Sequence, residues 1–226
     1  PRSQEFEPLK TGDGVLFIGN SFTSFYGPLP SAIHAVQKAA DPFVCTESSM
    51  DNAGKACGIL KEYVMLDSTS ARVMRAIREA RWKYVVLQTY KDAVDQYDCV
   101  PDESQACVGA PTGYPQNQDT LIKYFKILDD SIQAANAQTM LYSPHLLPTN
   151  YADNLAKVTE CNERLCQEAD VQYYVPVFWA WDSVLTDYPP DKWACPQQDA
   201  GGGVEMFYAD CQHQNPTGMA LDAFTW

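Results

Sequence analysis

The 226-residue sequence has no long apolar run and few basic residues. No run approaches the roughly 20 apolar residues of a membrane-spanning helix, so we expect no membrane span. Only 16 lysines and arginines stand against 29 acidic residues. The resulting net charge of −13 argues against nucleic acid and anionic membrane surfaces as partners. Neither absence identifies a substrate or an oligomeric state.

The eight cysteines include no Cys-x-x-Cys pair, which argues against a zinc ribbon or a thioredoxin-like site. Their even number favours a disulfide-bonded, secreted protein, the alternative being a reduced intracellular protein with buried thiols. We expect Cys99 and Cys107 to pair across a loop that contains proline and aspartate. Cys161 and Cys166 lie on separated faces of one expected helix, so each should bond elsewhere.

The chain begins at Pro1, with neither methionine nor a signal peptide before it, which suits a mature secreted protein or an excised piece. We interpret residues 1–12 as an N-terminal extension or cloning remnant, and residues 13–226 as one domain. A hydrophobic content of 46% and a charged content of 20% fit a globular domain of this length.

Strand-like and helix-like segments alternate along the chain, which predicts an α/β fold with a parallel sheet. The expected architecture is a three-layer α/β/α sandwich around about five parallel strands. Strands are expected at residues 15–19, 43–47, 84–88, 139–143 and 171–175. Helices are expected at residues 29–40, about 55–65, 70–81 with Ser70 as its cap, 119–137, 151–169, 178–185, and from Pro216 onward.

The first strand ends in Gly19-Asn20-Ser21, which places a serine hydroxyl at the carboxyl end of a buried strand. Far along the chain, Asp210-Cys211-Gln212-His213 carries an acid and a histidine three residues apart. Ser21, His213 and Asp210 therefore form a candidate nucleophile, general base and orienting acid.

Each of these residues also has a simpler interpretation. Ser21 could cap the following helix, and Asp210 could form a turn. Of the two other histidines, His145 follows the expected fourth strand and is the rival base. His34 lies inside an expected helix and is interpreted as a structural or surface residue.

The two motifs together resemble the SGNH (GDSL-like) hydrolase family, whose first block ends in Gly-Asp-Ser or Gly-Asn-Ser and whose last is Asp-x-x-His. The segment Trp82-Lys83-Tyr84-Val85-Val86-Leu87-Gln88 resembles the family's central strand. That strand normally ends in Gly-x-Asn-Asp, so Leu87-Gln88 is similar to a variant subgroup with a Leu-Gln ending. The resemblance implies an SGNH/flavodoxin-like fold and ester hydrolysis through an acyl-serine, with no metal and no organic cofactor.

Oxyanion stabilisation requires donors aimed at the developing charge. The N–H of Ser21 is the first candidate, and the resemblance implies Gly54 as the second, with Gly58 as its rival. The amide of Gln88 is the third candidate, although it could be only a hydrogen-bonded strand-end residue. Asn20 could instead brace the turn.

The resemblance implies a secreted serine esterase that acts on a small-molecule or polysaccharide ester. Carbohydrate O-acetyl groups are the first expected substrate, and short acyl or lipid esters the second. The alternative is a catalytically inactive glycan- or ligand-binding domain on the same fold, favoured by Gln88 and by Gln214 in place of the proline usual after the histidine.

Overall fold

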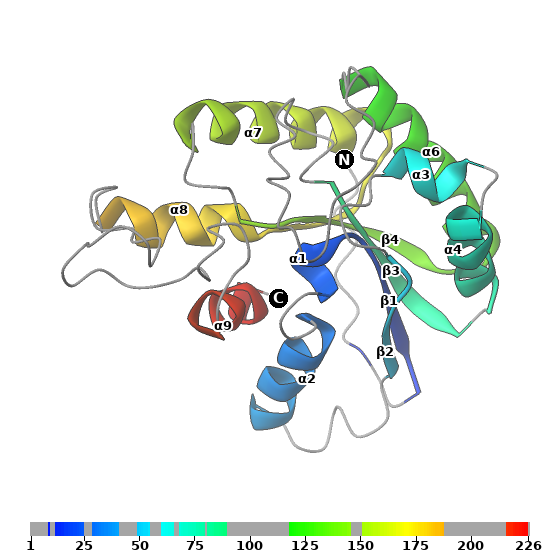
Figure 1. The fold of residues 1–226 in the computed structure, drawn as a ribbon, viewed down its shortest axis with the longest axis horizontal. Coiled ribbons are helices and arrows are strands. Elements are labelled where there is room, and N and C mark those ends of the chain that lie inside the picture. The colour runs from blue at the N-terminus through cyan, green and yellow to red at the C-terminus, as the bar shows by residue number, and fades with distance from the viewer. Residues whose placement is uncertain are drawn as a thin grey trace, which may run out of the picture.

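The structure, a computed structural model, describes residues 9, 12–24, 29–40, 49–54, 60–65, 68–79, 81–89, 118–145, 151–187 and 216–225. Within these residues, strands and helices alternate as the sequence predicts (Figure 1). The predicted loops at 89–117 and 187–204 lie almost wholly outside the described residues, as does the segment that contains Asp210 and His213.

The described strands form one parallel sheet in the order β2-β1-β3-β4-β5. Their bounds are β1 Gly14–Ile18, β2 Ser49–Asn52, β3 Trp82–Gln88, β4 Gln138–Ser143 and β5 Tyr173–Pro176. The predicted α/β class with a parallel sheet is therefore confirmed, because all four neighbouring pairs run in the same direction.

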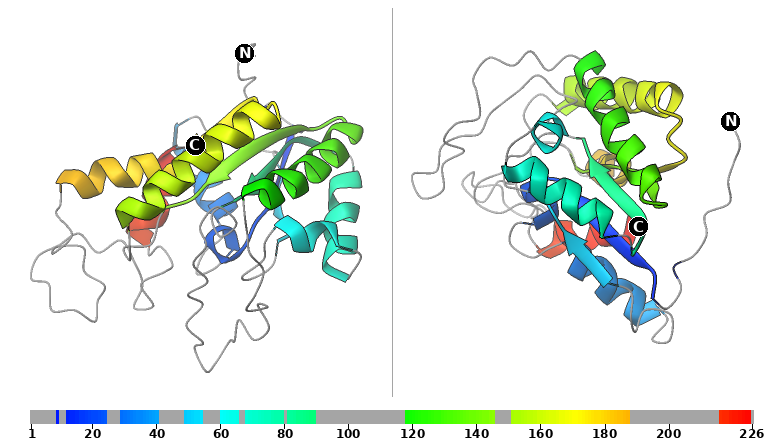
Figure 2. Two further views of the ribbon diagram at one scale, coloured as in Figure 1. Left: turned by 90° about the horizontal axis from the view of Figure 1, so that it is seen from above. Right: turned by 90° about the vertical axis from the view of Figure 1, so that its right-hand side faces the viewer.

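Helices cover both faces of the sheet and make a three-layer sandwich (Figures 1 and 2). One face carries α3 (Leu60–Val64), α4 (Ser68–Arg78), α6 (Gln118–Ala134) and α7 (Tyr151–Glu168), and the other carries α2 (Leu29–Ala40), α8 (Val177–Asp187) and α9 (Pro216–Thr225). None of the described helices combines the length and the hydropathy that crossing a bilayer requires.

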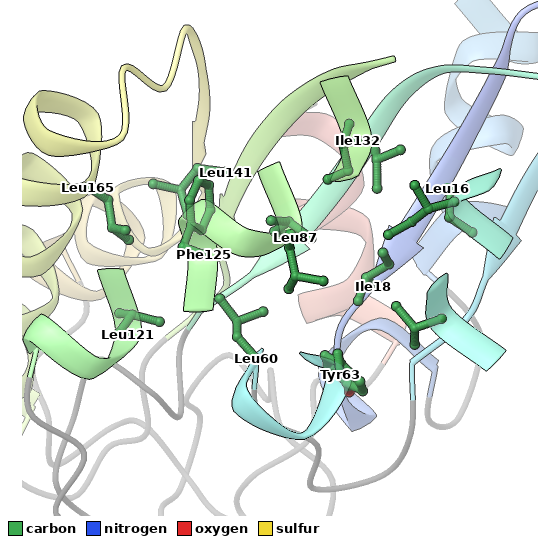
Figure 3. Close-up of a cluster of buried hydrophobic side chains, with 14 of the residues drawn as sticks. Leu16, Ile18, Leu60, Tyr63, Leu87, Leu121, Phe125, Ile132, Leu141 and Leu165 are labelled. Carbon is green, nitrogen blue, oxygen red and sulfur yellow. The ribbon is translucent and has the colours of Figure 1, made fainter. Parts of the chain in front are cut away.

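Alternation along β1 divides the core between the two faces, because successive side chains of a strand point in opposite directions. Leu16 and Ile18 enter the cluster beneath α3, α4, α6 and α7, where Leu87 and Phe125 also lie (Figure 3). Val15 and Phe17 enter the second cluster, against α2 and α9. Both faces of this central strand are therefore buried, as expected for a doubly wound sheet.

The strand order creates a switch point between β1 and β3. From β1 the chain crosses to β2 on one side, and it later continues to β3 and β4 on the other. In open parallel sheets ligands bind outside the carboxyl ends of the strands at such a point. β1 ends just before Gly19 and β3 ends at Gln88, so the fold places the two predicted site segments there.

Two local predictions are corrected. The second strand is expected at 43–47, but β2 lies at Ser49–Asn52, whose sequence is polar. It is an edge strand paired with β1 through its backbone, so it needs no apolar run. The structure also begins α4 at Ser68, which leaves Ser70 buried inside the helix and not at its cap.

The cysteine prediction is wrong at one position. Cys166 carries a free thiol on α7, and burial, followed by the charge of Glu163, raises the pKa of this thiol. Cys161 lies fully buried in the cluster beneath α7. The other six cysteines, including Cys99 and Cys107, lie outside the described residues, and their pairing stays a prediction.

Candidate active site

Asn20 caps α1 (Ser21–Ser24), the short helix that follows β1. The N–H of Phe22 donates to Asn20 Oδ1 (3.1 Å), which is the bond of an N-cap side chain to the second helical residue. The N–H and the hydroxyl of Thr23 both donate to the carbonyl oxygen of Asn20 (3.0 and 2.8 Å). Ser21 is therefore the first residue of the helix, and the N-cap, which was the simpler interpretation of Ser21, is Asn20.

Gln88 at the end of β3 clamps Asn20 through both ends of its amide. Its Nε2 donates to Asn20 Oδ1 (2.7 Å), and its Oε1 accepts from the Asn20 N–H (3.2 Å). Both residues are buried, Gln88 at 4% and Asn20 at 3% exposed. Because buried polar groups need hydrogen-bond partners, these two bonds satisfy groups that water cannot reach. Asn20 thus braces the turn, and Gln88 is the hydrogen-bonded residue at the strand end, through the same contact across the switch point.

Gly19 is the residue that lets this clamp close. A Cβ at position 19 would lie 2.5 Å from Gln88 Oε1 and 2.9 Å from Thr23 Oγ1, closer than real Cβ contacts allow. The Gly19 carbonyl oxygen also accepts from the Tyr63 hydroxyl of α3 (2.5 Å). The turn that presents Ser21 is therefore held from β3 and from α3 at the same time.

Gly54, the predicted second oxyanion donor, packs directly against the same turn. Its own N–H donates to Asn52 Oδ1 (2.8 Å), so in this structure it closes a local turn after β2. Its carbonyl oxygen accepts from Arg72 Nη2 (2.6 Å). The structure thus brings Gly54 beside Gly19 and gives its N–H a partner, while its rival Gly58 lies outside the described residues.

We expect Gly54→Ala to be strongly destabilising. The added Cβ would lie 1.8 Å from the Gly19 carbonyl oxygen, and backbone atoms cannot escape by changing rotamer. Overpacking of this kind costs roughly 1–3 kcal/mol or more, and here it also displaces the turn before Ser21. Urea unfolding measures the first effect, and ester turnover of the folded fraction measures the second.

Gly12→Ala is the control, because an added Cβ at position 12 meets no atom within 4 Å, although this position has a positive φ (91°). It should lose stability through backbone strain alone and keep its turnover. Equal losses of stability and of turnover in both variants would show that the contact with Gly19 is not the cause.

The Asn20–Gln88 clamp predicts strong coupling between the two side chains. Each single alanine variant leaves the buried polar groups of the other residue without a partner, which should lower the free energy of unfolding by about 1–3 kcal/mol. The double variant should therefore cost less than the sum of the two, with an interaction energy of about 0.5–3 kcal/mol. Chemical unfolding of the four proteins in the cycle measures this energy, and strict additivity would contradict the clamp.

His145, the rival base, is fully buried after β4. Its ring stacks on Trp181 of α8 (centroids 4.4 Å apart, 25° between planes) and meets the Phe22 ring edge-on (4.9 Å, 86°). Its Nδ1 lies 3.8 Å from Asp222 Oδ2 of α9. The structure therefore places a second histidine–aspartate pair close to α1, enclosed by aromatic rings. His34 lies half-buried on α2, as predicted for a structural or surface residue.

Two groups in this region have weak sequence signals. No local sequence pattern links Tyr63 to Gly19, because the two residues of this hydrogen bond lie 44 positions apart. The sequence marks Asp222 in one way only, as an isolated acidic residue in the otherwise apolar stretch Met219–Phe224. An acid at a core-facing helical position is a sign of a buried polar contact.

A cavity of about 410 Å³ lies elsewhere on the molecule. Val15, Ile33, Tyr84, Met140 and Tyr173 are among the side chains that line it, so it opens on the sheet face beneath α2. Of the predicted site residues that the structure describes, Ser21, Gly54 and Gln88, none lines it. The cavity therefore adds nothing to the candidate site at the switch point.

Comparison with known proteins supports the fold. No family model and no curated protein sequence matches the chain. Among solved structures it is similar to an acetyl-xylooligosaccharide esterase from Geobacillus, with a TM-score of 0.66 at 14% identity over 97% of this chain and 94% of that one.

Two other structures give the same picture. An acetyl xylan esterase has a TM-score of 0.63 at 14% identity, over 94% of this chain and 96% of that one. A protein described as a GDSL-like lipase, from Parabacteroides merdae, has a TM-score of 0.58 at 16% identity, over 100% and 97%. These likenesses establish that the chain has the fold of SGNH-type esterases and lipases.

Proposed function

We propose that this chain is an SGNH-type serine esterase, with Ser21 as nucleophile, His213 as general base and Asp210 as orienting acid. The observation that carries the proposal is the capping of α1 by Asn20, which makes Ser21 the first residue of this helix, close to the carboxyl end of β1. The fold it shares with esterases and lipases supports the same conclusion. The Leu87-Gln88 ending suggests the variant subgroup.

The proposed reaction transfers an acyl group to water in two steps. Ser21 Oγ attacks the ester carbonyl carbon while His213 takes the hydroxyl proton, and a tetrahedral oxyanion forms. Its collapse breaks the bond to the alcohol oxygen, which leaves with the proton from His213. Water then attacks the acyl-serine, giving its proton to His213, and collapse of the second tetrahedral intermediate releases the acid and restores the Ser21 hydroxyl.

The oxyanion donors remain those predicted, with their present partners taken into account. The Ser21 N–H lies at the first position of α1, directly after the clamped Asn20. Gln88 Nε2 carries two hydrogens, and Asn20 Oδ1 needs only one of them. Gly54 would have to redirect its N–H from Asn52 towards the substrate. We therefore rank Ser21 first, Gln88 second and Gly54 third.

Carbohydrate O-acetyl esters are the proposed substrates, ahead of short acyl and lipid esters. The similarity to an acetyl-xylooligosaccharide esterase and an acetyl xylan esterase supports this order through fold alone. A fluorophosphonate probe tests the proposal: an esterase should be labelled on the Ser21 peptide, and should release acetate from acetylated xylan. An unlabelled, inert protein would favour the alternative of a glycan-binding domain.

We also propose that the protein is secreted and that disulfides hold its cysteine-bearing loops. Disulfide mapping by mass spectrometry should find Cys99 linked to Cys107, with Cys166 open to alkylation after denaturation. Loss of a native disulfide typically costs about 2–5 kcal/mol, so reduction should lower the melting temperature. Fully reduced cysteines in protein from its native source would contradict the proposal.

A further inference from the structure

Four polar side chains meet inside the apolar cluster beneath α8 and α9. They are Tyr142 on β4, His145 just after β4, Trp181 on α8 and Asp222 on α9, and each has 0% of its surface exposed. Trp181 Nε1 donates to Asp222 Oδ1 (2.5 Å), and His145 Nδ1 faces Asp222 Oδ2 at 3.8 Å. The Asp222 carboxylate is therefore the centre of the group.

Tyr142 belongs to the same group. Burial raises the pKa of its hydroxyl well above the ordinary value, and the neighbouring Asp222 carboxylate adds to this rise. The hydroxyl therefore stays protonated and can donate to the carboxylate. Three side chains, one on β4, one just after β4 and one on α8, thus converge on one buried acid.

A buried carboxylate contributes little net stability to a protein core. Removal of a charge from water costs several kcal/mol, and apolar side chains of similar volume usually stabilise a core as well or better. Packing alone therefore does not explain Asp222. Its hydrogen bond from Trp181 and its contact with His145 instead tie α9 to α8 and to the end of β4.

The position of α9 matters because of what precedes it in the chain. Asp222 follows the predicted base His213 by nine residues, and α9 begins at Pro216, three residues after that histidine. On its other side the group reaches helix α1, because the His145 ring packs against Phe22, the residue after Ser21. The group thus connects α9 with helix α1.

We propose that His145 and Asp222 are positioning residues that hold α9, and with it the His213 segment, in register with the Ser21 helix. The proposal rests on the proposed function. The role differs from that of the rival base, because a general base must exchange protons with the nucleophile and the leaving group. The enclosed His145 ring acts instead through its contacts with Phe22, Trp181 and Asp222.

Two conservative variants test the proposal. Asp222→Asn keeps an oxygen for Trp181 Nε1 and removes the charge, whereas His145→Phe keeps the ring stack and removes the nitrogen that faces Asp222. Misplacement of catalytic groups by about 1 Å can cost about 10²-fold, so we expect kcat to fall roughly 10- to 100-fold in each. KM for p-nitrophenyl acetate should stay close to the wild-type value, and the rate of fluorophosphonate labelling should fall with kcat.

Because both variants break the same contact, the double variant should be no slower than the slower single variant. Asp129→Asn is the matched control. Asp129 is also a buried acid, on α6, where it accepts from Thr139 at the start of β4, and burial is the main cause that raises its pKa. It lies at the opposite end of β4 from His145, so this variant should keep the wild-type kcat.

The outcomes separate the two proposals. An active wild-type enzyme whose folded Asp222→Asn and His145→Phe variants keep the wild-type kcat and labelling rate overturns the positioning role and leaves the esterase intact. A wild-type protein that neither turns over esters nor labels overturns both. If Asp222→Asn does not fold, Trp181→Phe, which removes the indole donor and part of the ring while keeping an aromatic side chain beside His145, carries the same expectation.

Discussion

Ser21→Ala is expected to abolish ester hydrolysis while the protein remains folded. Removal of a triad nucleophile lowers kcat by roughly four to six powers of ten, because the remaining groups cannot form the acyl intermediate. Steady-state turnover of p-nitrophenyl acetate measures the loss. The fluorophosphonate probe should no longer label the protein.

Ser24→Ala is the matched control, since it makes the same change in the same four-residue helix. It should keep wild-type turnover and labelling. A folded Ser21→Ala protein with near wild-type turnover would remove Ser21 from the mechanism, and with it the proposed esterase chemistry.

The capping geometry adds a second readout to this experiment. Replacement of a capping serine or asparagine by alanine typically costs about 0.5–2 kcal/mol. Asn20 is the cap of α1, so Asn20→Ala should lower the melting temperature and Ser21→Ala should not. A clear loss of stability in Ser21→Ala would restore the simpler interpretation of Ser21 as a structural residue.

The sequence predicts the buried strands well and the edge strand β2 poorly. β1 and β3 are central and buried on both faces, so they have apolar runs that can be recognised. β2 has the sequence Ser-Met-Asp-Asn and, among the described strands, pairs with β1 alone. Because its place depends on backbone pairing with a distant segment, no local pattern could reveal it.

Helix ends show a similar limit. α6 is expected to reach residue 137, but the structure ends it at Ala134, and Asn136 adopts a φ of 60°. Asparagine is one of the few residues that tolerate this left-handed conformation, so it acts as the stop signal. The apolar periodicity continues past this point because Ala137 is buried outside the helix.

The sequence also predicts one part of the candidate site and misses another. The order of elements along the chain is enough to place Ser21 and Gln88 at the same edge of the sheet. The direct contact between Gln88 and Asn20 depends on the register of β1 against β3, which pairs Ile18 with Leu87. The group around Asp222 depends on how α9 packs across the sheet, which the sequence marks only by one acid among apolar residues.

His213→Ala is expected to lower kcat about as much as Ser21→Ala, because His213 is the proposed acceptor of the serine proton during attack. Asp210→Asn should lower kcat by roughly 10⁴, through the wrong tautomer of His213. His145→Phe should stay within the 10- to 100-fold loss of a positioning residue, since its ring is fully buried between Phe22 and Trp181. The order of these three losses, measured with one ester and with melting curves as the folding control, distinguishes the two histidine–aspartate pairs. If His145→Phe were inert and His213→Ala active, the base would be His145 paired with Asp222, and the Asp210–His213 segment would have no catalytic role.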